Sequence, residues 1–176
     1  SDVCSSDLCN DRILRTSTRD LLDLKKQHPT EDILALIGIG DSYRSEFWDD
    51  QLPPKLNDGH FKSVQANRLT SSNLNDIQKN YSRNWIMLRN DEAEITNLYY
   101  KLILFTSFLQ LNNIKYLIWA GPMTFKKVDD QTPFLKTFHE KILSDSCIID
   151  FYTFSFSHYC RMIKNHVPFD DALYGK

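Results

Sequence analysis

The chain has 176 residues, a formal net charge of −2 at neutral pH, 41% hydrophobic residues and 25% charged residues. This length suits one domain with its own core, and we expect a single domain over residues 9–176. The near-neutral charge excludes a broad electrostatic surface for nucleic acid or anionic lipid. The apolar runs, such as residues 33–39, are too short to cross a bilayer. We therefore expect a soluble protein with neither a membrane span nor a leader peptide.

The first eight residues, SDVCSSDL, match the translation of a common sequencing adaptor at every position. We interpret residues 1–8 as an artefact and expect them to make no core contacts. The natural sequence is then expected to begin near Cys9 and to be incomplete at that end. Three cysteines remain, and their spacing fits no metal site, so we expect reduced thiols, no metal and no cofactor.

The first half of the chain predicts a helix, a strand and a long loop. Residues 10–28 predict an amphipathic helix that Pro29 ends. Residues 32–40 (DILALIGIG) form a continuous apolar run closed by glycines, which predicts a strand buried on both faces. Residues 41–72 are polar and rich in turn residues, which indicates a long loop or insertion with room for short strands. The stripe expected on the helix is Ile13, Leu14, Ser17, Leu21 and Leu24.

The second half continues the alternation of helices and strands. Its strongest helix has a stripe made of Ile95, Leu98, Tyr99, Leu102, Thr106 and Leu109. The predicted elements are helices at 73–89, 91–112, 132–143 and 155–164, and strands at 114–120 and 147–151. Such alternation predicts an α/β fold: a three-layer α/β/α arrangement, flavodoxin-like, with a mostly parallel sheet. Residues 33–39 and 114–119 are expected to be neighbouring parallel strands.

Function in such folds gathers in the loops at the carboxyl ends of the strands. The first strand ends in Gly38 and Gly40, and Asp41, Arg44 and Glu46 follow closely. One interpretation makes this segment the edge of a pocket. The other makes it a turn in which Arg44 and Glu46 are solvated while the following aromatics, Phe47 and Trp48, pack into the core.

The triplet Gly40-Asp41-Ser42 is similar to the nucleophile motif of GDSL esterases. A serine nucleophile needs a base, which in that superfamily is a histidine three residues after an aspartate. None of the five histidines in this chain has an aspartate at that position. Ser42 with His60, the nearest histidine in sequence, is therefore a weak catalytic pair. His139 stands on a predicted helix and is expected to be solvated or capping.

Two stretches resemble SGNH-hydrolase-like proteins of phages and marine viruses. One joins residues 9–13 (CNDRI) to 36–38 (LIG) and 44–49 (RSEFWD), and the other is residues 109–117 (LQLNNIKYL). The resemblance implies that Asn10 follows the family's second block and that Gly38-Ile39-Gly40-Asp41 stands at its third block. That block's oxyanion asparagine would be replaced by Gly40. The serine block would precede the chain and the Asp-x-x-His block would follow it.

The resemblance implies a fragment of an SGNH-hydrolase-like domain, with esterase or carbohydrate-deacylase chemistry in the complete protein. Whether the chain is an enzyme is left open, and the fragment as given is expected to be inactive. Its substrate would be an ester or an acylated carbohydrate, with no nucleic acid and no membrane as partner. The alternative is a non-catalytic structural or binding domain of a phage on the same fold. Either would act in the cytoplasm of an infected host or in the virion.

Overall fold

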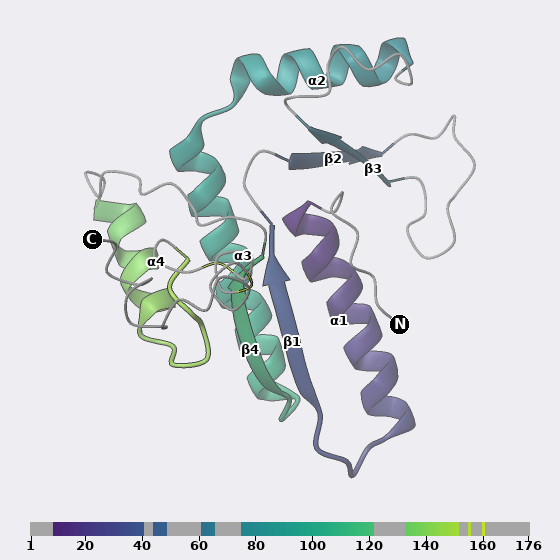
Figure 1. Ribbon diagram of the computed structural model, residues 1–176, viewed down its shortest axis with the longest axis vertical. Helices are drawn as coiled ribbons and strands as arrows, with labels where there is room; N and C mark the ends of the chain where they lie inside the picture. Colours follow the sequence, from purple (N-terminus) through teal and green to yellow (C-terminus); the bar gives the residue numbers. More distant parts are fainter. Residues whose placement is uncertain are drawn as a thin grey trace.

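The structure, a computed structural model, describes residues 9–40, 44–48, 61–65, 75–121, 133–151, 155 and 160 (Figure 1). The prediction for residues 1–8 lies outside this part. The described chain has mixed α/β character, and none of its helices is long and apolar enough to span a membrane. In chain order its elements are α1 (Asn10–Gln27), β1 (Leu34–Ile39), β2 (Arg44–Trp48), β3 (Phe61–Gln65), α2 (Asp76–Leu88), α3 (Asp91–Leu111), β4 (Lys115–Ala120) and α4 (Pro133–Leu143).

The strands β1 and β4 form a small parallel sheet, which confirms that the two apolar runs are neighbouring parallel strands. Their register runs from Leu34 opposite Lys115 to Ile39 opposite Ala120. On the other side of β4, Ile118 makes a parallel bridge with Ile148. The strand predicted at 147–151 is thus reduced to one bridged residue in the described chain.

The helix predicted to begin at Ser155 was wrong in its first residue. Ser155 is buried and makes a parallel bridge with Ala120, so it extends the sheet. Cys160 is helical, and the other residues of the range 155–164 lie outside the described part.

Helix α3 contributes more residues to the core of the described chain than any other element, as its apolar periodicity predicts. All six residues of its predicted stripe are buried: Ile95, Leu98, Tyr99, Leu102, Thr106 and Leu109. The side chain of Asn90 caps the helix by accepting the backbone N–H of Ala93 at 3.0 Å. Helices α1 and α3 contact each other and the sheet, and α4 packs against α3. Alternate residues of both strands face this helical layer: Ala35, Ile37, Ile39, Tyr116, Ile118 and Ala120.

The expectation that β1 is buried on both faces was wrong. Leu34 and Leu36, on the face opposite Ala35 and Ile37, are 61% and 59% exposed. A continuous apolar run hides the alternation of inward and outward residues, because leucine occupies both sides of the pleat. The sequence therefore identifies the strand without showing which face carries a helix.

The segment 41–72 contains an antiparallel hairpin, which agrees with the prediction that this long loop or insertion could hold short strands. β2 pairs with β3 from Arg44 opposite Gln65 to Trp48 opposite Phe61. The hairpin and α2 lie beyond the carboxyl end of β1, away from the base of the sheet (Figure 1). The Phe47 ring stacks on Tyr81 of α2, with ring centroids 4.6 Å apart. This hairpin brings charged side chains next to the first turns of α1.

Candidate functional site

Glycines lie at the carboxyl ends of β1 and β4, where the two backbones contact each other. The backbone N–H of Gly121 donates to the carbonyl oxygen of Ile39 at 2.8 Å. A Cβ atom at Gly121 would stand 3.3 Å from that same oxygen, and one at Gly38 would stand 3.4 Å from the Trp119 ring. A side chain at Gly121 would therefore be tight against the backbone of β1, whereas one at Gly38 would make ordinary contact with the Trp119 ring.

Several residues of the predicted site fall outside the described part of the chain. Asp41, Ser42 and His60 are among them, and the pairing of Ser42 with His60 stays a prediction. Gly40 is described and buried, directly after β1. Asn10 is half-buried in the first turn of α1. Arg44 is placed only by its backbone, which pairs with Gln65.

Of the two interpretations of the segment after β1, the one that leaves Glu46 solvated in a turn is wrong for this residue. Its side chain is only 4% exposed and forms an ion pair with Arg15, whose two terminal nitrogens reach the two carboxylate oxygens. The Arg12 Nε atom lies 3.5 Å from Glu46 Oε2, and the Arg12 side chain is 10% exposed. The same interpretation placed Phe47 and Trp48 in the core, and Phe47 is buried whereas Trp48 is 54% exposed. A carboxylate taken out of water needs such partners, since an unpaired buried charge is strongly unfavourable.

Two elements position this charge cluster. Arg12 and Arg15 stand three residues apart on α1, which places both on one face of the helix. β2 presents Glu46 to that face, and the hydroxyl of Tyr81 donates to the Glu46 backbone oxygen at 3.3 Å. The cluster of Arg12, Arg15 and Glu46 therefore joins α1 to the hairpin, and α2 supports it.

Cys9 lies beside the charge cluster, at the N-cap of α1, and is 1% exposed. Burial raises the pKa of its thiol to about 11, and the nearby carboxylate of Glu46 also raises it. A thiol with this pKa is protonated at neutral pH, while the nucleophilic form of cysteine is the thiolate. Cys9 is therefore a packing residue.

Alkaline pH is expected to weaken the fold through Cys9. The thiol pKa is about 11 in the folded chain against an ordinary value of 9.0, so its contribution is complete below pH 9 and is lost as pH rises to 11. The full effect is on the order of 2–3 kcal/mol. Urea unfolding at pH 8 and pH 11 would measure it. Cys9→Ala should lose less stability between these pH values than the unchanged chain, and equal losses would contradict the assignment.

A shallow cavity of about 550 Å³, widely open to solvent, lies between α1 and α3, next to the charge cluster. Two ion pairs stand on its wall: Arg15 with Glu46, and Lys101 with Asp11 at 2.5 Å. The rest of the wall is formed by Leu14, Thr18, Leu104, Phe105 and Phe108. We call this space the α1–α3 cavity.

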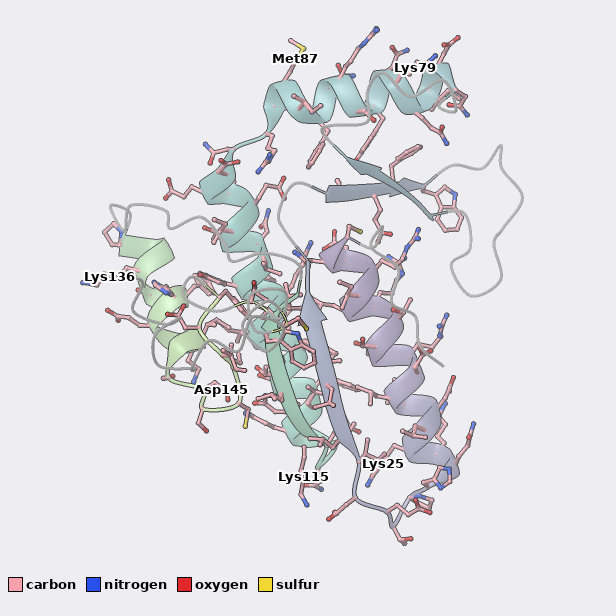
Figure 2. The ribbon with its side chains drawn as sticks, in the orientation of Figure 1. Lys25, Lys79, Met87, Lys115, Lys136 and Asp145 are labelled. Carbon is pink, nitrogen blue, oxygen red and sulfur yellow. The ribbon has the colours of Figure 1, made fainter. Side chains whose placement is uncertain are left out.

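A second, smaller cavity of about 330 Å³ lies between α3 and the segment after α4. Its wall includes Asp145, which Figure 2 labels below α4. The Tyr116 hydroxyl accepts from Gln110 at 2.8 Å and donates to Asp145 Oδ2 at 2.6 Å. The other carboxylate oxygen of Asp145 accepts the backbone N–H of Cys147 at 2.9 Å. These bonds fix the chain where it enters its bridge with β4, so we interpret this network as structural.

The structure describes two of the five histidines, His28 and His139. His28 Nδ1 lies 2.9 Å from Glu31 Oε1, but this exposed pair precedes β1, at the opposite end of the strand from Gly38 and Gly40. The His139 ring stacks on buried Tyr99, with ring centroids 5.8 Å apart, so the expectation of a solvated His139 was wrong. Within the described ranges, no cluster of three or more His, Cys, Asp or Glu residues could hold a metal ion.

Sequence reasoning missed Arg12 and Arg15 as partners of Glu46. Helix periodicity assigns arginines to the solvated face, and nothing in the stripe marks Arg12 as buried. The available signal was the position of Glu46 directly before two aromatic residues, Phe47 and Trp48, in the segment that follows the first strand. That pattern indicates a buried carboxylate without naming its partner.

Comparison of the chain with models of protein families, with curated proteins and with solved structures found no match. The resemblance to SGNH-hydrolase-like proteins therefore stays a prediction. The described geometry is the ground on which function can be argued.

Proposed function

We propose that this chain is part of an SGNH-hydrolase-like domain whose chemistry, in the complete protein, lies at the carboxyl ends of β1 and β4. One observation carries the proposal: two adjacent parallel strands end in glycine-containing segments that meet in the hydrogen bond between Gly121 and Ile39. Open α/β sheets bind ligands at this edge. The substrate would be an ester or an acylated carbohydrate.

The proposal extends to the layers of the fold. In a three-layer α/β/α domain, helices would also cover the face that carries Leu34 and Leu36. The exposure of these two leucines supports a covering layer, because large apolar side chains on the strands of a parallel sheet are normally buried. The described part supplies the helical layer on one face, formed by α1 and α3.

The chemistry would be attack of a serine hydroxyl on the acyl carbonyl, with a histidine as base and backbone or amide N–H groups stabilising the oxyanion. In this chain Gly40 stands where the family has its oxyanion asparagine, so it offers only a backbone N–H at that position. Glu46 is unsuited to act as a general base, because Arg12 and Arg15 hold it in ion pairs. No Asp-x-x-His occurs in the 176 residues, and the resemblance places Gly40-Asp41-Ser42 at the family's third block and not at its serine block.

The chain as given is expected not to hydrolyse p-nitrophenyl acetate or p-nitrophenyl butyrate above the rate of its Ser42→Ala variant. Loss of triad members lowers rates by about 10⁴–10⁶-fold, so a chain without several of them would show no turnover of its own. The comparison uses purified protein and the absorbance of released p-nitrophenolate at about 400 nm. Ser45→Ala is the matched control. Turnover abolished by both Ser42→Ala and His60→Ala would overturn this expectation.

The alternative function is a non-catalytic binding or structural domain that keeps the fold. The observation favouring it is that the buried carboxylate of Glu46 is engaged in ion pairs that join α1 to the hairpin. Sequencing the complete gene distinguishes the two functions. A Gly-x-Ser block before Cys9 with an Asp-x-x-His block after Lys176 supports the hydrolase, and a complete gene lacking both blocks supports the binding domain.

A further inference from the structure

We propose that the α1–α3 cavity is a binding site for a small, uncharged alcohol with an apolar ring or short alkyl body. The site goes beyond the proposed hydrolase function, because its wall is formed by α1, α3 and Glu46 and not by the ends of β1 and β4. Its volume of about 550 Å³ lies within the range of small-molecule sites, roughly 300–1,000 Å³.

The apolar residues of the cavity wall favour a ligand whose body is apolar. Leu14 and Phe105 are buried, and the Phe105 and Phe108 rings stack with their centroids 6.2 Å apart. Leu104 completes this wall and is 53% exposed, so an apolar side chain stands at the opening of the cavity. An apolar ring or alkyl chain seated here would remove this surface from water, which is favourable in proportion to its area.

The charged wall sets the charge of the ligand. Its two cations and two anions form ion pairs with one another, Arg15 with Glu46 and Lys101 with Asp11. The charges on the wall balance, so a charged ligand would lose part of its hydration without gaining a net opposite charge. The wall as a whole is therefore complementary to an uncharged molecule.

Thr18 sets the polar group of the ligand. Its hydroxyl donates to the backbone oxygen of Leu14 at 2.8 Å, so its proton is already engaged. The hydroxyl oxygen still has acceptor capacity toward the cavity it lines. The group that complements an acceptor is an O–H donor, which makes an alcohol the expected class.

Three probes of one shape test the inference: cyclohexanol, cyclohexanecarboxylate and cyclohexylamine, titrated into the ¹⁵N-labelled chain and followed by amide chemical shifts. Cyclohexanol should give saturable shifts in residues 11–18 of α1 and 101–108 of α3. The two charged probes should bind at least about tenfold more weakly, the equivalent of one lost favourable contact. Shifts confined to β1 and β4, no saturable shift, or equal binding of a charged probe would each overturn the proposal.

Two variants separate the cavity from a general apolar surface. Leu104→Trp should fill the opening and weaken cyclohexanol binding at least about tenfold, while Leu111→Trp, on the same helix at an 83% exposed position, should leave it unchanged. Thr18→Val removes the acceptor with little change of volume and should weaken cyclohexanol more than it weakens methylcyclohexane. Undiminished cyclohexanol binding in Leu104→Trp contradicts the site. Should that variant fail to fold, an equal effect of Thr18→Val on both probes contradicts the alcohol assignment.

Discussion

Replacing Glu46 with alanine is expected to lower the free energy of unfolding by about 3–5 kcal/mol. The change removes the Glu46 carboxylate that pairs with the guanidinium of Arg12, whose side chain is 10% exposed. Arg15 is 38% exposed and can turn toward water, so most of the loss is expected to come from Arg12. The expected loss is a large share of the about 5–15 kcal/mol by which natural domains are stable.

Urea unfolding followed by circular dichroism measures this loss, with Asp20→Ala as the matched control. Asp20 also pairs with an arginine of α1, Arg19, but its side chain is 66% exposed, and the expected cost is below about 1 kcal/mol. Adding Arg12→Met to Glu46→Ala should restore part of the stability, since an apolar side chain can replace a buried charge at little cost. Equal losses in Glu46→Ala and Asp20→Ala would show that the cluster is not the buried ion pair described here.

Leu102→Ala is expected to cost about 2–5 kcal/mol of unfolding free energy. Leu102 is fully buried in the middle of α3, within the core cluster that includes the strand residues Ile37 and Ile118. Truncating it removes apolar contacts on the sheet side of the helix and leaves a cavity that close-packed neighbours fill only in part. Because alanine has the higher helix propensity, the loss would come from packing and not from the helix backbone.

The control for this prediction is Leu111→Ala on the same helix. Leu111 is 83% exposed, and its truncation is expected to change stability by less than about 0.5 kcal/mol. Thermal unfolding of the two variants side by side gives the comparison. A Leu102→Ala variant as stable as Leu111→Ala would contradict the packing of α3 against the sheet.

The elements with strong periodicity could be predicted from the sequence. The six-residue stripe of α3 and the two apolar runs of β1 and β4 gave correct elements, and the parallel pairing of those strands followed from the helix between them. Periodicity identifies these elements because the apolar face of a helix, or an apolar strand, must be buried in the core whatever the arrangement of the other elements. For the hairpin of β2 and β3, the sequence predicted only a long loop that could contain short strands. The pairing could not be predicted, because the composition of the loop determines no strand register.

The candidate site could be predicted only in part. Glu46 was identified as a pocket residue, but its burial depends on Arg12 and Arg15, which lie some thirty residues earlier in the chain. Contacts over such a separation are set by how α1 packs, and a single sequence carries no local signal for them. The exposed face of β1 has the same cause: Leu34 and Leu36 are as apolar as Ile37, and only packing distinguishes them.

The register of β1 with β4 has a consequence for the order of folding. Leu34 pairs with Lys115, so the sheet closes a loop of about 80 residues, whereas α1, α2 and α3 form from contacts within a few turns. Closing a long loop costs chain entropy before any pairing compensates it, and chains with more distant contacts fold more slowly. Sheet formation is therefore expected to be a late step, and a ribosome-bound chain ending before Ala120 would hold β1 as an unpaired strand with its leucines open to other chains.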